Sequence, residues 1–586
     1  MEITTVQSVR ITAGTEDEQL ENCRKVLRDQ LISRGVCTDP RGNAGLEICL
    51  FQDKTQEKDS YCITENEEKI ISISSGSFSG LLAGAGRFLR DSVFTKGGMV
   101  PSSWRGKSVS SCNVRGIQMD THFNNFYNTA SVQELSKYAE DLALWGINCF
   151  DVVFPLIDFS GWDDPAMELI IEKIGAVHQK ARALGLQIGL EIVPNQDFVQ
   201  YHKEFIAAKN MEPVRRRGNN GHNLCPSIPG ALEYLKNTYV RVIRTLKEKG
   251  ILMDFICFWP YDEGGCSCAN CAPWGANGYI KASKAILSGI RKELPGVKVI
   301  LSTWLFDTPF DEGEWSGLSR ELSAGKSWVD YILADSHTDF PLYPVTKGVP
   351  GKLPLINYPE ISMWGLFPWG GYGANPLPKR FERLWSQVKD HVSGGIAYSE
   401  GIFDDINKCV VSSFYWNKDA GEKDILKEYI SWYYDPAVVP GVTDAIEMIE
   451  ENHRLTAPGN ERAITRDSNT EAVTEEVCRR AETARELLSE AEKKLTEEAR
   501  SGWRWRILKI RAELDCLRFS LSLANRKALT ADTTWTDVLK GNREAIGLMT
   551  ELSEIYHSRY DTDTGIHPMY KCVRPALTEI KEDADD

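Results

Sequence analysis

Two adjacent acids, Asp262 and Glu263, are the residues of this chain best suited to acid chemistry. A positioned carboxyl group can deliver a proton to a leaving group, and a second carboxylate can orient or stabilise the reacting centre. Adjacent residues in an extended strand point to opposite sides, so both acids reach one pocket only where a strand ends and the backbone turns. Whether the two acids can act together therefore depends on where the preceding strand ends.

Short apolar runs alternate with amphipathic helical stretches from about residue 111 onward, which is the pattern of a (β/α)8 TIM barrel. A doubly wound sheet is the competing architecture, but no Gly-rich phosphate loop follows the first run. The expected strands are Val114–Met119, Cys149–Phe154, Gln187–Ile192, Phe255–Trp259, Val297–Ser302, Tyr331–Ala334, Leu355–Tyr358 and Gly395–Tyr398. Asp262 and Glu263 thus come just after the fourth strand.

Polar side chains follow almost every expected strand of this barrel. Chemistry in (β/α)8 barrels lies at the C-terminal ends of the strands, and a purely structural barrel would need few carboxylates there. Besides the acidic pair, the residues at these ends are Asp120, His122, Asp158, Glu191, Asn195, Trp304, Asp307, Asp335, His337, Glu360, Trp364 and Glu400. We therefore expect an enzyme.

The aromatic content favours a sugar substrate. The chain contains 16 Trp and 20 Tyr residues, although core packing explains most of them. The flat C–H faces of sugars stack on aromatic rings in binding clefts. Cleavage of a glycosidic bond needs a proton for the leaving oxygen and a group that stabilises an oxocarbenium-like carbon, and two carboxyl groups usually supply both. We expect an oligosaccharide or glycoside as substrate and no cofactor for the chemistry.

Two motifs resemble those of glycoside hydrolase family 20, the β-N-acetylhexosaminidases. The segment Arg115–Asp120 is similar to the family's Arg-Gly-x-x-x-Asp, and Asp262-Glu263 is similar to its acidic pair. The resemblance covers roughly residues 1–430. It implies that Arg115 binds substrate hydroxyls, that Asp262 orients the 2-acetamido group of the substrate, and that Glu263 is the general acid.

The resemblance also implies an exo-acting, retaining mechanism. The acetamido oxygen of the substrate is the nucleophile in that scheme, so no protein carboxylate attacks the sugar. Trp304 and Trp364 would line the sugar pocket, and Tyr358 or Tyr398 would hydrogen-bond the acetamido carbonyl. The other residues expected to contact substrate are Asp120, His122, Glu360 and Glu400.

Glu400 supports an alternative mechanism. The family's His-x-Gly-Gly is replaced by Trp259–Tyr261, and the segments around Glu360 and Glu400 look like those of poorly characterised bacterial barrel proteins. With Glu263 as acid and Glu400 or Glu360 as base or nucleophile, the enzyme would be an α-glucuronidase-like or other exo-glycosidase. A third hypothesis is a carbohydrate-binding barrel without catalysis, and Glu400 would then cap the next helix.

Three thiols follow the acidic pair closely. Cys266, Cys268 and Cys271 lie within a run of six residues, and thiolates are good ligands of tetrahedral Zn²⁺. Cys225, in the loop between the third and fourth strands, is the expected fourth ligand, with His222 as the reserve choice. Four thiolates leave no open position for water, so we expect a structural zinc site. The alternative is free or disulfide-bonded cysteines that brace a turn.

Two further regions flank the barrel. Residues 1–110 mix β-rich runs with a helix over 79–90 and predict a small α/β domain. Residues 433–586 carry long, charged, helix-periodic stretches, which predict a C-terminal helical domain with a frayed acidic tail at 579–586. The catalytic barrel then occupies residues 111–432.

Charge and targeting signals narrow the partners. A net charge of −15 argues against nucleic acid and anionic membrane surfaces. No apolar run approaches about eighteen residues, so we expect no membrane span. The first residues show no signal-peptide pattern and fifteen cysteines suit a reducing compartment, so we expect a cytoplasmic protein. A chain with its signal removed would look the same, and a homo-oligomer is compatible with the sequence.

Overall fold

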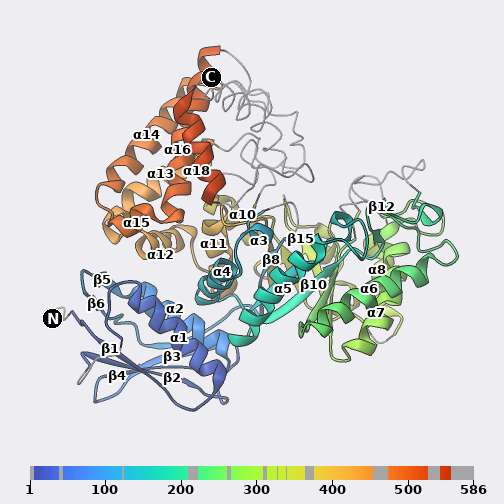
Figure 1. Cartoon of the computed structure of the whole chain (residues 1–586), viewed down its shortest axis with the longest axis horizontal. Helices are drawn as coiled ribbons and strands as arrows, with labels where there is room; N and C mark the ends of the chain where they lie inside the picture. Colours follow the sequence, from blue (N-terminus) through green and yellow to red (C-terminus); the bar gives the residue numbers. More distant parts are fainter. Residues whose placement is uncertain are drawn as a thin grey trace.

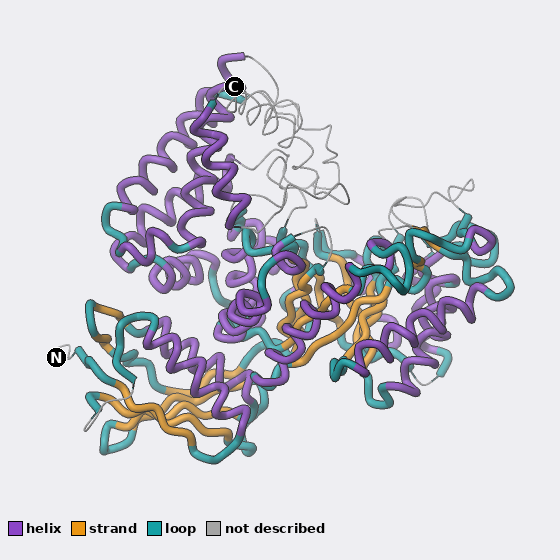
Figure 2. Tube along the Cα trace, in the orientation of Figure 1, coloured by secondary structure: helices purple, strands orange, loops and turns teal. Residues whose placement is uncertain are grey.

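The computed structural model describes residues 5–38, 44–121, 125–208, 222–260, 265–307, 313–325, 327–337, 339–362, 375–452, 473–525 and 542–555. These residues form three regions that follow one another along the chain (Figure 1). A mixed α/β region comes first, a barrel forms the centre, and a set of helices comes last. The two larger sheets, one in the first region and one forming the barrel, are separate in space (Figure 2), and two short two-stranded sheets lie outside them.

The first region is a five-stranded sheet with two helices packed on it (Figure 1). Helix α1 (Glu18–Ile32) begins after Asp17, whose carboxylate accepts hydrogen bonds from two backbone N–H groups of the first turn. Helix α2 spans Phe78–Asp91. The strand order is β1-β2-β4-β3-β7, with bounds Val9–Ala13, Leu46–Gln52, Ile70–Ser75, Ser60–Glu65 and Gly106–Val109.

Helix α2 joins this region to the barrel. Gly86 lies so close to helix α4 (Val132–Leu144) that a Cβ would stand 1.9 Å from the carbonyl oxygen of Leu144, so only glycine permits the approach. Arg90 donates to the same carbonyl at 2.6 Å and pairs with Glu428 at 2.6 Å. Small residues on α2 thus set the distance between the first region and the barrel.

Eight parallel strands close into a barrel in the order β10-β13-β14-β15-β16-β17-β8-β9. Each agrees with an expected strand to within one residue at either end, so the predicted (β/α)8 architecture is confirmed. In chain order the bounds are β8 Val114–Met119, β9 Cys149–Val153, β10 Gln187–Ile192, β13 Phe255–Phe258, β14 Lys298–Ser302, β15 Tyr331–Asp335, β16 Leu355–Tyr358 and β17 Gly394–Ser399.

Helices cover the outside of the barrel, so its strands are buried on both faces. The interior towards the N-terminal ends of the strands is apolar and includes Phe255, Ile300 and Ile396. Towards the C-terminal ends the inward positions become acidic or aromatic. The longer covering helices are α4, α5 (Ala166–Ala183), α6 (Ala231–Glu248), α7 (Gly278–Glu293), α8 (Glu314–Ser323), α10 (Pro378–Val388) and α11 (Asp405–Trp416).

The last region is helical and docks on the seam of the barrel. Arg504 pairs with Asp405 of α11 at 2.6 Å and with Asp141 of α4 at 3.1 Å, so its side chain bridges the first and last long helices around the barrel. The helices are α12 (Glu422–Tyr433), α13 (Val439–Asn452), α14 (Glu475–Glu492), α15 (Glu497–Ser501), α16 (Trp503–Asn525) and α18 (Arg543–Ile555). The acidic tail 579–586 lies outside the described residues. Within the described ranges, no helix has both the length and the apolarity needed to cross a bilayer.

Candidate active site

The seam between strands β17 and β8 brings two acids together at the mouth of the barrel. Ser399 lies opposite Met119 in the pairing of these strands, so the next residues, Glu400 and Asp120, leave the barrel side by side. The Tyr398 hydroxyl lies 2.8 Å from Asp120 Oδ2 and also within hydrogen-bond distance of Glu400 Oε1, so its single proton is donated to one of the two carboxylates at a time. Both acids are almost completely buried. One phenol thus fixes two carboxylates of the candidate site.

Buried polar contacts fix the backbone of Glu400. Its N–H donates to the Ser362 hydroxyl at 2.8 Å, and that hydroxyl donates to Asp404 Oδ2. Asp404 in turn pairs with the Lys408 ammonium group, and all these groups are buried. Because a buried polar group without partners is costly, this chain of contacts favours one position of Glu400.

Glu360 follows strand β16 and is held differently. It forms a parallel bridge with Tyr398, and its Oε1 accepts a hydrogen bond from the backbone N–H of Ser362 at 2.6 Å. Its carboxylate therefore shapes the turn that supports Glu400. This contact makes Glu360 less suited than Glu400 to act on a substrate.

Aromatic rings line the side of the mouth formed by strands β13 to β16. Trp259 stacks on Trp304 with ring centroids 5.4 Å apart, and Tyr358 lies 4.6 Å from Trp259. His337 continues this wall, with its ring 5.7 Å from both Trp304 and Tyr358. Trp259, Tyr358 and His337 are buried in this set, whereas Trp304 is partly exposed and offers a flat face on which a sugar can stack.

The orientation of His337 is set by its neighbours. Asp335 Oδ1 accepts the backbone N–H of His337 at 2.8 Å and lies 2.6 Å from its Nδ1. The Trp304 indole N–H donates to Nε2 at 3.3 Å, which requires a lone pair on that nitrogen. The contacts therefore assign the ring proton to Nδ1 and make His337 a brace for Trp304.

Burial keeps the two phenols of the mouth protonated. Burial raises the pKa of Tyr358 well above its ordinary value, and the nearby charges of Glu191 and Asp120 add to the effect. The pKa of Tyr398 is raised in the same way by burial, Asp120 and Glu400. Both hydroxyls therefore remain donors at neutral pH, and that of Tyr358 donates to Gln118 Oε1 at 2.6 Å.

Arg115 is not at this mouth, which corrects its expected role as a ligand of substrate hydroxyls. It is the second residue of β8, about 16 Å of extended strand before Asp120. Its buried guanidinium group pairs with Asp59 of the first region at 2.8 Å and donates to the carbonyl oxygen of Gly146 at 2.7 Å. Arg115 therefore ties the base of the barrel to the first region.

Of the other expected substrate contacts, Asp120, Trp304, Tyr358, Glu360, Tyr398 and Glu400 lie together at the mouth. Tyr358 packs against Trp259 and is only 2% exposed, so it supports the wall. Asp262, Glu263, His122 and Trp364 lie outside the described residues.

Several residues that build the mouth are not among those expected from the sequence. Trp259 ends the expected fourth strand and points inward like Phe255 and Cys257, so period-two alternation could have revealed it. No sequence pattern pointed to Ser362 or Lys408. A serine or a lysine outside a strand gives no indication of which distant groups its side chain will contact.

The four expected thiols also come together. The sulfur atoms of Cys225, Cys266, Cys268 and Cys271 all lie within 4.8 Å of one another. The side chain of His222, the reserve ligand, lies outside the described residues.

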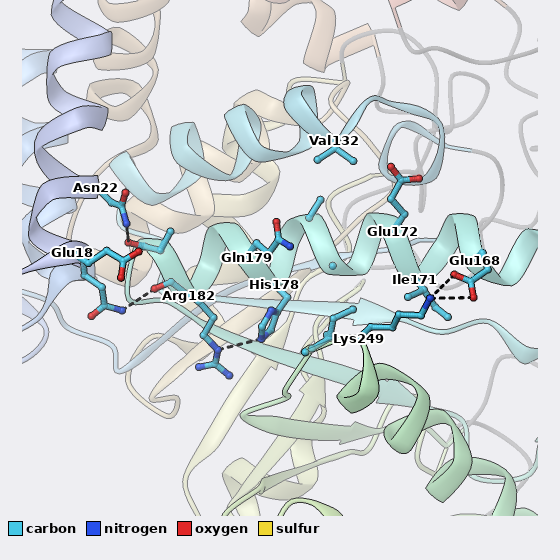
Figure 3. A pocket seen from close by; sticks show the side chains of 16 residues that line it. Glu18, Asn22, Val132, Glu168, Ile171, Glu172, His178, Gln179, Arg182 and Lys249 are labelled. Carbon is cyan, nitrogen blue, oxygen red and sulfur yellow. Dashed lines mark hydrogen bonds and ion pairs between the residues drawn. The ribbon is translucent and has the colours of Figure 1, made fainter.

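A surface pocket of about 800 Å³ lies elsewhere, against helices α1 and α5 (Figure 3). Its walls include Arg182, which donates to His178 at 3.3 Å, and Lys249, which pairs with Glu168 at 3.1 Å. These residues come from helices and from the loop after α6 rather than from strand ends. We therefore place the candidate active site at the barrel mouth.

The fold and the mouth together define a (β/α)8-barrel protein with a carboxylate seam facing an aromatic wall. No family model matches the sequence, and no curated protein matches it. A family GH138 enzyme that targets pectin rhamnogalacturonan II has a similar structure, with a TM-score of 0.59 over 99% of both chains at 12% identity. A family GH115 4-O-methyl-α-glucuronidase with specificity for decorated arabinogalactans gives 0.60 over 95% of this chain and 78% of that one, at 11% identity.

Family 20 is also among the similar structures. An exo-β-N-acetylglucosaminidase of that family from Vibrio harveyi gives a TM-score of 0.49 over 76% of this chain and 75% of that one, at 13% identity. The similar structures thus are glycoside hydrolases of several families, 89 among them, and family 20 is not singled out. At these identities the likeness to the family GH138, GH115 and 89 structures shows a shared fold.

Proposed function

We propose that this protein is an exo-acting glycoside hydrolase that uses two protein carboxylates, with Glu263 as the general acid and Glu400 as the second group. Glu263 protonates the glycosidic oxygen as the bond to the anomeric carbon breaks. Glu400 either attacks that carbon or takes a proton from the water that attacks it. The partly exposed ring of Trp304 stacks on the sugar, and the buried ring of Trp259 supports Trp304.

The order of strands in the barrel carries this proposal. Strand β13 and strand β17 are four places apart in a ring of eight, so their ends face each other across the mouth. Glu263 follows β13 in the sequence, and Glu400 follows β17. A glycosidic bond held across the mouth would therefore have one acid on each side, as this chemistry requires.

The fixed position of Glu400 gives further support. A catalytic carboxylate must be held in one geometry, and the contacts of Glu400 with Tyr398 and Ser362 do this. The fold that this chain shares with glycoside hydrolases of several families agrees with such chemistry. An α-glucuronidase-like activity is one form of the proposal.

Substrate-assisted hydrolysis is the second candidate. It rests on the adjacent acids Asp262 and Glu263, which would orient an acetamido group and protonate the leaving oxygen from the same strand end. In that mechanism Tyr358 or Tyr398 would have to donate to the acetamido carbonyl, and the Tyr358 hydroxyl is buried and donates to Gln118 Oε1. The Tyr398 hydroxyl lies within hydrogen-bond distance of Asp120 Oδ2 and Glu400 Oε1 and donates its proton to one of them, which favours the mechanism with two protein carboxylates.

A panel of aryl glycosides tests the function. It should pair each 2-acetamido sugar with its 2-hydroxy counterpart and include aryl glucuronides in both anomeric forms. We expect turnover of at least one 2-hydroxy glycoside. Turnover of 2-acetamido sugars alone would support the substrate-assisted mechanism instead. Binding of sugars without turnover of any glycoside would indicate a carbohydrate-binding barrel.

A further inference from the structure

The four thiols beside the barrel mouth have the spacing of a single metal site. The Cys225 sulfur lies 3.7 Å from that of Cys268 and 3.8 Å from that of Cys271. A tetrahedral Zn²⁺ with Zn–S bonds of about 2.3 Å sets its sulfur ligands about 3.8 Å apart. A disulfide would need sulfur atoms about 2.05 Å apart, and these cysteines are free thiols. The geometry thus fits one ion held by four sulfurs.

We propose that Cys225, Cys266, Cys268 and Cys271 bind one structural Zn²⁺ ion. Four thiolates fill the coordination shell, so no position remains for water or substrate. Each thiol that binds the ion gives up its proton to solvent, and neither sulfur nor zinc changes its oxidation state. The ion itself takes no part in hydrolysis.

The surroundings of the sulfurs suit a charged thiolate site. Cys266 and Cys271 are fully buried, and Cys225 is 3% exposed. The Ser227 hydroxyl lies 3.3 Å from the Cys271 sulfur and accepts a hydrogen bond from the Lys281 ammonium group at 3.4 Å. With its oxygen engaged by Lys281, the hydroxyl proton can point to the sulfur. This contact supplies both a donor and a nearby positive charge.

The site joins two loops that are far apart in the sequence. Cys225 precedes helix α6, and its backbone N–H donates to the carbonyl oxygen of Phe205 at 2.7 Å. The other three cysteines lie between strand β13 and helix α7. A zinc ion held by all four would therefore crosslink the loops after β10 and β13.

Trp274 connects this crosslink to Pro260 and Gly265, which stand on either side of the segment 261–264 in the sequence. Its indole N–H donates to the carbonyl oxygen of Pro260 at 2.6 Å, on one side of that segment. On the other side, a Cβ on Gly265 would stand 2.7 Å from the Trp274 ring, so glycine is required there. Trp274 is fully buried three residues after Cys271. The four cysteines thus act as positioning residues for both flanks of the segment.

The first test uses the wild-type chain alone. Native mass spectrometry and elemental analysis after dialysis against a weak chelator should find one zinc per chain. Reconstitution with Co²⁺ should give the sulfur-to-metal charge-transfer and d–d absorption of a tetrahedral thiolate site. A metal-free chain, a disulfide among the four cysteines, or iron in place of zinc would each overturn the proposal.

Variants then assign the ligands. Cys268→Ser and the double variant Cys225→Ala with Cys271→Ala should lose zinc and melt at a lower temperature. The matched control is Cys23→Ser, which replaces another buried thiol and should retain one zinc. Full zinc content in the double variant would contradict the assignment. If the double variant does not fold, the zinc content of Cys268→Ser and of the wild-type chain still shows whether these cysteines bind the ion.

The metal content and melting temperature do not depend on the proposed hydrolase. The positioning role does rest on it, and its readout is a fall in kcat with little change in KM that added Zn²⁺ reverses in metal-depleted protein. A zinc-containing chain that turns over no glycoside would leave the metal site intact and overturn the proposed function. Unchanged kcat in metal-depleted protein would overturn the positioning role.

Discussion

Tyr398 donates a hydrogen bond to Asp120 Oδ2 over 2.8 Å, and this bond joins the last strand of the barrel to the first. The same hydroxyl lies within hydrogen-bond distance of Glu400 Oε1, so one side chain contacts both acids at the point where backbone pairing of β17 with β8 closes the barrel. Since burial and the two carboxylates raise the pKa of Tyr398 well above its ordinary value, the bond persists at neutral pH. The seam between β17 and β8 therefore both closes the barrel and positions the two acids of the candidate site.

Replacing Tyr398 by Phe should lower kcat/KM by about 10- to 100-fold, because a hydrogen bond to a charged group is worth about 1.5–3 kcal/mol. The matched control is Tyr415→Phe. Tyr415 is also fully buried, and its hydroxyl donates to Asn357 Oδ1 at 2.9 Å, but it lies on helix α11 rather than at the mouth. Steady-state kinetics of both variants on the same aryl glycoside make the comparison. Equal losses in the two variants would show that Tyr398 acts only through the stability of the fold.

The strands of the barrel could be predicted because each is an apolar run bounded by polar residues. The approach of Glu400 to Asp120 could not, because it depends on the register of two strands whose sequence positions differ by about 280 residues. The role expected for Arg115 failed for a related reason. A motif gives only the order of residues. Whether a side chain lies at the base or at the mouth of the barrel depends on where its strand begins and ends.

Thiols were easier to predict than acids. Three cysteines close in sequence already limit the geometry of a site, and Cys225 was the cysteine in the neighbouring loop. Carboxylates are common on surfaces, so only their place at strand ends distinguished Glu360 and Glu400 from many others. Contacts such as that of Ser362 with the Glu400 backbone depend on loop conformation, which no local pattern encodes.

Arg504 should be critical for the attachment of the C-terminal helices. Burial raises the pKa of Asp405, but the ion pair with Arg504 and further contacts outweigh it and hold this pKa below its ordinary value. Arg504→Gln leaves buried carboxylates without their cation and should cost about 3–5 kcal/mol in the unfolding transition of this region. Urea denaturation measures the loss.

A surface ion pair provides the control for Arg504. Arg500 pairs with Glu497 on the exposed face of α15, so Arg500→Gln should cost less than about 1 kcal/mol. The lowered pKa of Asp405 also predicts that its stabilisation is present above the unfolded-state pKa and is lost as the pH falls through the folded-state pKa. A loss for Arg504→Gln no larger than that for Arg500→Gln would contradict the role of this pair.

Asp151 should make stability fall as the pH rises. It is buried inside the barrel, its Oδ1 has no hydrogen-bond partner among the described residues, and burial raises its pKa to about 8. Between about pH 4 and pH 8 the unfolded chain has lost this proton while the folded chain keeps it, so the unfolded state binds fewer protons and stability decreases with pH. Asp151→Asn removes this titratable group and with it this part of the pH dependence of stability.

Urea denaturation of wild type and Asp151→Asn at pH 5, 6, 7 and 8 tests the effect. The variant should gain stability relative to wild type at each step, with the largest gain at pH 8. A constant difference between the two proteins across this range would show that Asp151 ionises in the folded barrel as readily as in the unfolded chain.

The central claim is that Glu400 takes part in glycoside hydrolysis, and the kcat/KM of Glu400→Gln on a 2-hydroxy aryl glycoside tests it most directly. The matched control is Glu450→Gln, because Glu450 is also buried but accepts hydrogen bonds from the backbone of helix α10. We expect a loss of about 10²–10⁴-fold for Glu400→Gln, with an unchanged circular dichroism spectrum, and little loss for Glu450→Gln. A kcat/KM within about threefold of wild type for a folded Glu400→Gln protein would contradict the claim.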